Sequence, residues 1–404
     1  MSSPTGGARF DSLCVAPPSP TGDGDPLVAS IVQSTTFVRD GLESGAVHRY
    51  SRESNPTVAA LERSLGRLED ALDALCFATG LAAETALILA TARSGDHVVC
   101  SRAVYGGTTR LLRQVFADLG VDATFVDTTV PCEVANALRP ETKLVFVETP
   151  SNPTLVLSDL REIAAIVRAS RAILAVDNTF LTPVLQQPLE LGAHVSVYST
   201  TKFIEGHSVA LGGALVTRDA ALRERLFFLR KCTGAIQSPF QAWLTLNGLK
   251  TLPLRIERQS ANAERVARWL AGHEDVAVVH HPSLPGFPQR QLADAQHRGG
   301  HGAVVSFELA GGQERARRLL RGVRLCRLAE HVGSVETLLT HSASMTHAAV
   351  PREERDALGI SDALIRLSVG LEDPRDVIDD LAVAIAGSRA CDAQEEVIRC
   401  AAAE

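Results

Sequence analysis

One lysine stands where the chain could place a catalytic amine. Lys202 follows the run 193–198, in which apolar and polar residues alternate with the period of two that is typical of a β-strand. Small hydroxyl residues surround it in the stretch 199–208, which reads Ser-Thr-Thr-Lys-Phe-Ile-Glu-Gly-His-Ser. Because open α/β sheets bind ligands beyond the carboxyl ends of their strands, Lys202 is our candidate catalytic residue.

A carboxylate is expected at the same edge. The apolar run 172–176 predicts a buried parallel strand that ends in Asp177. Pyridoxal phosphate needs such a pair: a lysine forms a Schiff base with its aldehyde, and an acid holds the proton of its ring nitrogen. Neither residue alone is informative, since most lysines are solvated and most strand-end aspartates cap turns.

Several motifs, in matching order and spacing, bring the chain close to a known family. They are 105–108 (Tyr-Gly-Gly-Thr), 148–153 (Glu-Thr-Pro-Ser-Asn-Pro), 177–180 (Asp-Asn-Thr-Phe) and 199–208. Together they resemble the motifs of the cystathionine γ-synthase and γ-lyase family, the fold-type I pyridoxal-phosphate enzymes of cysteine and methionine metabolism. The likeness extends from Ser30 to Ile385.

The elements around these motifs alternate as in a mostly parallel sheet. Strands are predicted at 96–100, 143–148, 172–177 and 193–198, and a helix at 158–169, capped by Ser158, separates two of them. Further helices are predicted at 219–231, 238–250 and 256–270. The resemblance implies an α/β fold of type I, with a mostly parallel, seven-stranded sheet in a large domain and a smaller C-terminal α+β domain.

We expect three segments along the chain. Residues 1–57 form an N-terminal arm that contacts a neighbouring subunit, and its first part, 1–27, is rich in Pro, Gly, Ser and Asp and should be mobile. Residues 58–257 form the large cofactor-binding domain, and 258–404 form the C-terminal domain. Strands are predicted in that last domain at 303–309 and 364–369.

The resemblance also implies roles for individual residues. Beside Lys202 and Asp177, Tyr105 would stack on the cofactor ring and assist departure of the leaving group. The other cofactor-binding residues that it implies are Tyr50, Arg52, Gly80, Leu81, Asn152, Thr179, Ser199 and Thr201. The substrate-binding residues that it implies are Arg110, Glu330, His331, Val332 and Arg366.

Physical arguments accompany some of these roles. The small-residue turn 78–83 opens a helical pattern, so its backbone N–H groups could bind a phosphate. Arg366 alternates with apolar residues, so its guanidinium either extends to solvent or faces a cavity, where it could bind a carboxylate through two parallel hydrogen bonds. Tyr50 and Arg52 alone read as a packing tyrosine and a solvated arginine. By resemblance they complete a neighbouring subunit's site, which implies a homo-oligomer, with a tetramer of two active dimers expected.

Three positions depart from the family or from one branch of it. His331 stands where a serine is usual, and an imidazole differs from it in bulk and in its titration near neutral pH. The alternative is that the loop shifts and His331 points to solvent. Val209 stands where aspartate is usual, and Gly107 stands where methionine γ-lyases typically have cysteine.

The activity implied by the resemblance is γ-replacement or γ-elimination on an amino acid with an activated Cγ. The substrate would be of the O-acyl-homoserine or cystathionine type, and the reaction would pass through a vinylglycine-like intermediate on the cofactor. A specialised-metabolism enzyme with another substrate or nucleophile is an alternative. A non-catalytic member is a further one, against which the intact Lys202, Asp177, Tyr105 and Arg366 argue.

Composition excludes several other classes. The net charge of -7 and the lack of a basic stripe argue against binding to nucleic acid or to an anionic membrane. The longest nearly apolar stretch, 74–90, is interrupted by polar residues and is too short to span a bilayer. The scattered cysteines indicate reduced thiols, and we expect a cytoplasmic protein. Histidines occur at 280–281, 297 and 301, but glycine and proline interrupt the helices needed to hold a metal, so no metal site is predicted.

Overall fold

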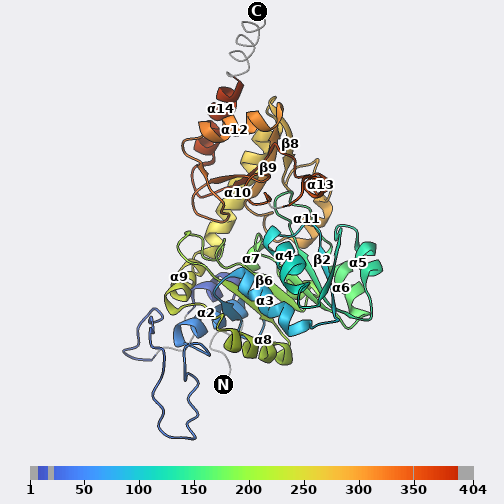
Figure 1. Ribbon diagram of the computed structural model, residues 1–404. Helices are drawn as coiled ribbons and strands as arrows, with labels where there is room; N and C mark the ends of the chain where they lie inside the picture. The colour runs from blue at the N-terminus through green and yellow to red at the C-terminus, as the bar shows by residue number, and fades with distance from the viewer. Residues whose placement is uncertain (1–7, 17–21, 349, 390–404) are drawn as a thin grey trace, which may run out of the picture. The chain divides into compact units, whose positions relative to one another are not determined.

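The computed structural model describes residues 8–16, 22–348 and 350–389 (Figure 1). The chain forms two compact units, one of residues 1–150 and 156–254 and the other of residues 151–155 and 255–404. Residues 1–7 and 17–21 of the predicted arm, and residues 390–404 of the predicted C-terminal domain, lie outside the described residues.

The first unit contains a seven-stranded sheet with the order β1-β7-β6-β5-β4-β2-β3. The five neighbouring strands β6, β5, β4, β2 and β3 pair in parallel. Strand β7 pairs antiparallel with both β6 and β1. The predicted mostly parallel, seven-stranded α/β sheet is therefore confirmed. Its strands are β1 Leu75–Phe77, β2 His97–Ser101, β3 Asp122–Val126, β4 Thr142–Glu148, β5 Ile173–Asp177, β6 Val195–Tyr198 and β7 Gly213–Thr217.

Five helices, α2, α3, α6, α8 and α9, begin after a residue whose side chain accepts a hydrogen bond from a backbone N–H of the first turn. Asp159 caps α6, which corrects the prediction of Ser158, because the Ser158 hydroxyl instead lies 2.7 Å from that of Thr128. The helices in the first part of the chain are α1 Phe10–Val15, α2 Pro56–Leu68, α3 Gly80–Thr91, α4 Gly106–Arg110, the π-helix η1 Leu111–Phe116, α5 Pro131–Ala137, α6 Leu160–Arg168, α7 Thr182–Leu185, the 3-10 helix η2 Pro188–Leu191, α8 Ala220–Thr233, α9 Pro239–Leu249 and α10 Leu252–Ala271.

The side chains of this sheet alternate between two apolar cores. In β4, Leu144 and Phe146 pack with α3, η1 and α8, whereas Val145 and Val147 pack with α6 on the other face. In β5, Ala175 joins the first core and Val176 the second. The same period of two turns the last residues of β4 and β5 toward the face that α3 covers.

The second unit contains a five-stranded sheet with the order β10-β11-β12-β9-β8, antiparallel except for the β10-β11 pair. Helices α10, α12 and α14 pack on one face around a single apolar core, which confirms the predicted smaller α+β fold. The strands are β8 Val276–His280, β9 Val304–Leu309, β10 Arg327–Leu328, β11 Leu338–His341 and β12 Leu364–Ser368. The helices are α11 Arg290–Gln296, α12 Gly312–Gly322, α13 Arg352–Ala357 and α14 Pro374–Arg389.

Candidate active site

Two acidic residues end neighbouring strands at the carboxyl edge of the large sheet. Glu148, the last residue of β4, pairs in register with Asp177, the last residue of β5. Asp177 is 9% exposed, and its Oδ1 accepts a 2.9 Å hydrogen bond from the backbone N–H of Thr179. Burial raises the pKa of Asp177. A cationic partner at this edge would therefore stabilise the ionised form of Asp177.

The loop that carries Lys202 is tied to the same strand end. The Thr179 hydroxyl accepts a 2.8 Å hydrogen bond from the N–H of Ser199, and the Ser199 carbonyl accepts one of 3.1 Å from the N–H of Lys202. The Thr201 hydroxyl donates to the carbonyl of Gly212 and accepts from its N–H. The structure thus brings Lys202 and three of the predicted cofactor-binding hydroxyl residues to one side of Asp177.

Lys202 differs in its place from the other lysines of the chain. Lys143 lies at the opposite end of β4, where its Nζ is 3.9 Å from an Asp96 carboxylate oxygen. Lys231 lies near the end of α8 and pairs with Glu53, and Lys250 follows α9. Lys202 is therefore the lysine in the loop that follows β6 at the carboxyl edge of the sheet.

A buried hydrogen-bond network lies next to the carboxyl ends of β5 and β6. Nδ2 of Asn178 donates to the Gln186 carbonyl at 2.7 Å and to the Tyr198 hydroxyl at 3.1 Å. The Tyr198 hydroxyl donates in turn to Glu69, whose pKa burial raises to about 7. The network fixes the residues next to Asp177 and Ser199. Sequence patterns gave no sign of Glu69, because it comes from the end of α2, far along the chain.

The amino end of α3 provides backbone donors beside Ser199. Thr79 caps the helix, and its hydroxyl accepts a 3.0 Å hydrogen bond from the N–H of Ala82. A Cβ on Gly80 would lie 3.1 Å from that of Ser199, so glycine allows a close approach here. The N–H groups of Gly80 and Leu81 belong to the first turn, which has no helical acceptors for them. Their position suits a phosphate group.

Tyr105 lies at the entrance to α4, where its backbone N–H donates a 2.7 Å hydrogen bond to Oε2 of Glu148. Its ring is 39% exposed and lies over Gly107: a Cβ at that position would come within 2.3 Å of the ring. The absence of a side chain at Gly107 therefore permits this orientation of the Tyr105 ring. Arg110, at the end of α4, is exposed.

Tyr50 and Arg52 have other contacts within the chain. The Arg52 guanidinium stacks over the Tyr50 ring at 5.4 Å and donates a hydrogen bond to the carbonyl of Lys231 in α8. Tyr50 is 44% exposed, and Arg52 is also exposed. Tyr50 also forms a β-bridge with Thr36, so these contacts of the two residues lie within the N-terminal segment and at the end of α8.

In the second unit, Arg366 organises a buried polar group. It lies in β12 and is 3% exposed, on the sheet face opposite the apolar core. Its guanidinium donates to Asn152 Oδ1 at 2.8 Å, to the His331 carbonyl at 2.9 Å and to the Thr340 hydroxyl at 3.1 Å. The structure thus brings together three residues that sequence had predicted separately: Asn152, His331 and Arg366.

His347 adds a neutral imidazole near this arginine. It is almost fully buried, and burial, followed by the charge of Arg366, lowers its pKa to about 4. A neutral His347 contributes no second positive charge, and sequence reasoning did not single it out. Of the remaining predicted substrate-binding residues, Val332 is buried and Glu330 is exposed, while His331 is half-buried.

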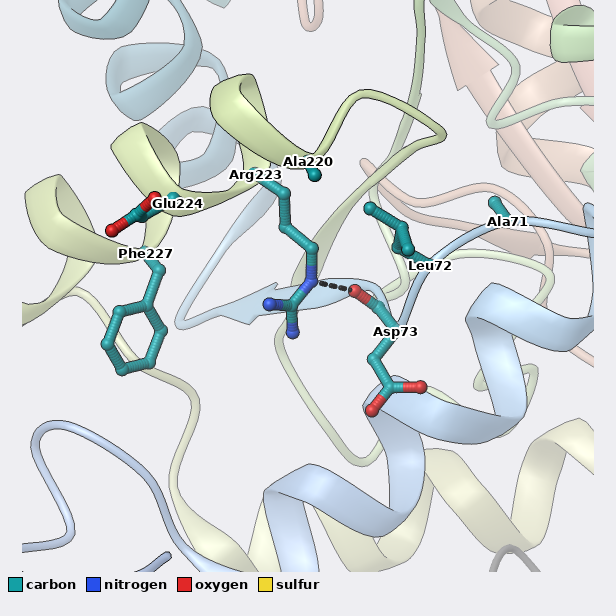
Figure 2. A pocket seen from close by; sticks show the side chains of 7 residues that line it. All are labelled: Ala71, Leu72, Asp73, Ala220, Arg223, Glu224 and Phe227. Carbon is teal, nitrogen blue, oxygen red and sulfur yellow. Dashed lines mark hydrogen bonds between the residues drawn. The ribbon is translucent and has the colours of Figure 1, made fainter. Parts of the chain in front are cut away.

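A cavity of about 590 Å³ lies on another part of the first unit. Figure 2 shows it between α8 and the segment after α2, where Nε of Arg223 donates a 2.6 Å hydrogen bond to the Asp73 carbonyl. Its lining contains none of the predicted site residues: it consists of Ala71, Leu72, Asp73, Ala220, Arg223, Glu224 and Phe227.

Neither a membrane-spanning helix nor a cluster of metal ligands occurs in the described ranges. No helix between residues 8 and 389, the masked positions aside, has the length and apolar character needed to cross a membrane. Over the same residues, no group of three or more His, Cys, Asp or Glu side chains is arranged to hold a metal ion.

The fold places this protein in the fold-type I class of pyridoxal-phosphate-dependent enzymes, in which the cofactor lies at the carboxyl edge of such a sheet. Within that class, the chain belongs to the Cys/Met metabolism PLP-dependent enzyme family, whose model matches residues 16–386. It is thus an enzyme that uses pyridoxal phosphate, and the resemblance inferred from its motifs is confirmed.

Named relatives include both lyases and synthases. The chain is 42% identical to cystathionine γ-lyase of Bacillus subtilis (strain 168), over 88% of this chain and 93% of the relative. It is 44% identical to cystathionine γ-synthase of Mycobacterium tuberculosis (strain ATCC 25618 / H37Rv), over 88% and 91%. A crystal structure of cystathionine γ-synthase from Xanthomonas oryzae pv. oryzae, in complex with aminoacrylate and cysteine, matches with a TM-score of 0.92 and 39% identity, over 95% and 99%.

Proposed function

We propose that the protein catalyses γ-replacement or γ-elimination on an amino acid whose Cγ carries a leaving group. The observation that carries the proposal is the joining of the Lys202 loop to Asp177 at adjacent strand ends, in a chain of this family. Relatives named for both a synthase and a lyase support the same reaction class. O-acyl-homoserines and cystathionine are the substrate types we expect.

The residues around Asp177 fit pyridoxal phosphate. The first turn of α3, with Gly80 and Leu81, and the hydroxyls of Ser199 and Thr201 would hold its phosphate. Asp177 would pair with its ring nitrogen. When bound, the cofactor supplies a carbonyl that condenses with the substrate amine and a ring that withdraws electrons from Cα.

The chain's own side chains then divide the remaining tasks. Lys202 would take the proton from Cα and return protons as the leaving group departs. Tyr105, whose exposed ring is held over Gly107, would assist that departure. Arg366 would bind the substrate's α-carboxylate through its planar guanidinium.

A second candidate is γ-substitution with an unusual substrate or nucleophile. His331 favours it, because its carbonyl is bonded to Arg366 and its imidazole replaces the smaller serine side chain that is usual there. The larger ring would reduce the space beside the substrate carboxylate.

A product assay tests the reaction class. Purified enzyme is given an O-acyl-homoserine or cystathionine, each with and without cysteine. γ-Replacement should yield cystathionine from the acyl-homoserine and cysteine, whereas γ-elimination should yield 2-oxobutanoate and ammonia without added thiol. If no product forms from either substrate type while the cofactor is bound, the primary assignment fails, and thiols other than cysteine then test the second candidate.

We further propose that the active form is a homodimer, paired into a tetramer. The exposed Tyr50 and Arg52 belong to a segment that also leaves Leu27, Val38 and Leu42 largely exposed, at 87%, 93% and 95%. Figure 1 shows this segment in blue, as long loops. An apolar surface of this kind fits an interface with a second copy of the chain.

Subunit mixing tests whether Arg52 completes the partner's site. Arg52→Ala and Lys202→Ala should each be inactive, but a mixed dimer would contain one intact composite site. Under random exchange, half of the dimers are mixed, so about a quarter of the wild-type activity should return. A mixture of Lys202→Ala with Asp177→Asn is the control and should gain nothing, because both changes affect the same chain's site. Proven exchange without recovery in the first mixture would contradict the shared site.

A further inference from the structure

Glu84 is a buried carboxyl for which the proposed reaction has no use. It lies in the second turn of α3, is 4% exposed, and accepts a 2.7 Å hydrogen bond from the hydroxyl of Thr108 in α4. It forms no salt bridge within residues 22–348 or the other described ranges. Since burying an uncompensated charge is costly, this environment favours the protonated acid. The sequence signal was a lone acid in the nearly apolar stretch 74–90.

Glu84 shares its surroundings with Asp177. The alternation of the strands turns Cys100, Glu148 and Asp177 to the face of the sheet that α3 covers. Burial and then the charge of Asp177 raise the pKa of Glu84 to about 8, against a smaller lowering by Thr108. The Cys100 thiol is neutral, because burial and the charges of Glu84 and Glu148 raise its pKa. The two carboxyls Glu84 and Asp177 therefore resist ionising together.

We propose that Glu84 is a positioning residue that acts through Asp177. Glu84 is protonated while no cation contacts Asp177, and it releases its proton to solvent when a cation binds against Asp177. The inference rests on the proposed function in one respect, that the cation is the protonated ring nitrogen of pyridoxal phosphate. A cation relieves the repulsion between the two carboxylates. Cation binding and proton release are thus linked, and each promotes the other.

The pH dependence of cofactor affinity tests this linkage. Glu84→Gln removes the proton but keeps an acceptor for Thr108. The dissociation constant of pyridoxal phosphate is measured without substrate, from about pH 6 to about pH 9. Because ionised Glu84 favours the cation, wild-type affinity should rise with pH relative to that of the variant. We expect a change of about tenfold, which corresponds to a one-unit shift of the Glu84 pKa on binding. A constant ratio overturns the proposal.

Two further variants separate this role from a structural one. Thr108→Val removes the hydrogen bond that lowers the pKa of Glu84, so the rise in affinity should move to higher pH. Glu224→Gln makes the same change at an exposed position of α8 and should follow the wild type. If Glu84→Gln fails to fold, Thr108→Val alone tests the proposal. The proposal is overturned if, in Thr108→Val, the affinity for pyridoxal phosphate rises at the same pH as in the wild type or at a lower pH. Because substrate is absent, failure of the γ-reaction assay leaves this outcome unaffected.

Discussion

Lys202→Ala should abolish turnover and the covalent attachment of the cofactor. The chain's other lysines lie at the opposite end of β4, near the end of α8 or after α9, so none replaces the amine that follows β6. Loss of its proton transfers alone should lower kcat by about 10²-fold to 10⁴-fold, and loss of the nucleophile adds to this. The measurement is product formation, together with mass spectrometry after borohydride reduction, which should fix the cofactor to the peptide of Lys202 in the wild type only.

Lys143→Ala is the matched control for that experiment. It removes an equivalent amine at the other end of a central strand, where the partly exposed Lys143 lies 3.9 Å from a carboxylate oxygen of Asp96. An ion pair this long contributes little to stability, so folding, turnover and borohydride labelling should stay close to wild type. Labelling that persists in Lys202→Ala, or that maps to another lysine, would show that the catalytic amine has been misassigned.

Patterns local in the sequence predicted the sheet edge well. The apolar run before Asp177 and the alternating run before Lys202 correspond to β5 and β6, which end at Asp177 and Tyr198. Helices α8 and α9 begin and end within two residues of their predicted bounds. Both successes have the same cause: burial imposes a period of two or of 3.6 on neighbouring residues, and such a period is visible in the sequence.

Features that depend on distant partners were not predictable in this way. Tyr198 reads as an ordinary strand residue, yet its hydroxyl binds Glu69, 129 positions away. Strand β7 and the edge strand β1 pair antiparallel outside the β-α-β alternation and were missed. The grouping of Asn152, His331 and Arg366 likewise depends on tertiary packing. Val209, which stands where aspartate is usual, is 61% exposed, and its backbone N–H donates a hydrogen bond to Oε2 of Glu205.

Asp177→Asn should leave the cofactor able to bind but lower kcat by about 10²-fold to 10³-fold, roughly 3 to 4 kcal/mol of transition-state stabilisation. A neutral amide keeps an acceptor for the Thr179 N–H, so the local fold should persist. It cannot hold the ring-nitrogen proton as a carboxylate does, and the ring then withdraws electrons less strongly. Because this interaction matters most as charge develops, KM should change less than kcat. Steady-state kinetics on the fully loaded variant give both values.

The cofactor-free form of Asp177→Asn supplies an independent check. Burial raises the pKa of Asp177 in the folded chain above its value in the unfolded chain. The free energy of unfolding therefore falls as the pH rises from the pKa of the unfolded state to that of the folded state. Replacing it with asparagine removes that cost, and the melting temperature at neutral pH should increase even as kcat falls. Asp159→Asn, which retains a good cap on α6, should leave both quantities near wild type. A residue kept for catalysis is expected to lower the stability of the cofactor-free protein. A lower melting temperature of the variant with unchanged kcat would therefore assign Asp177 a purely structural role.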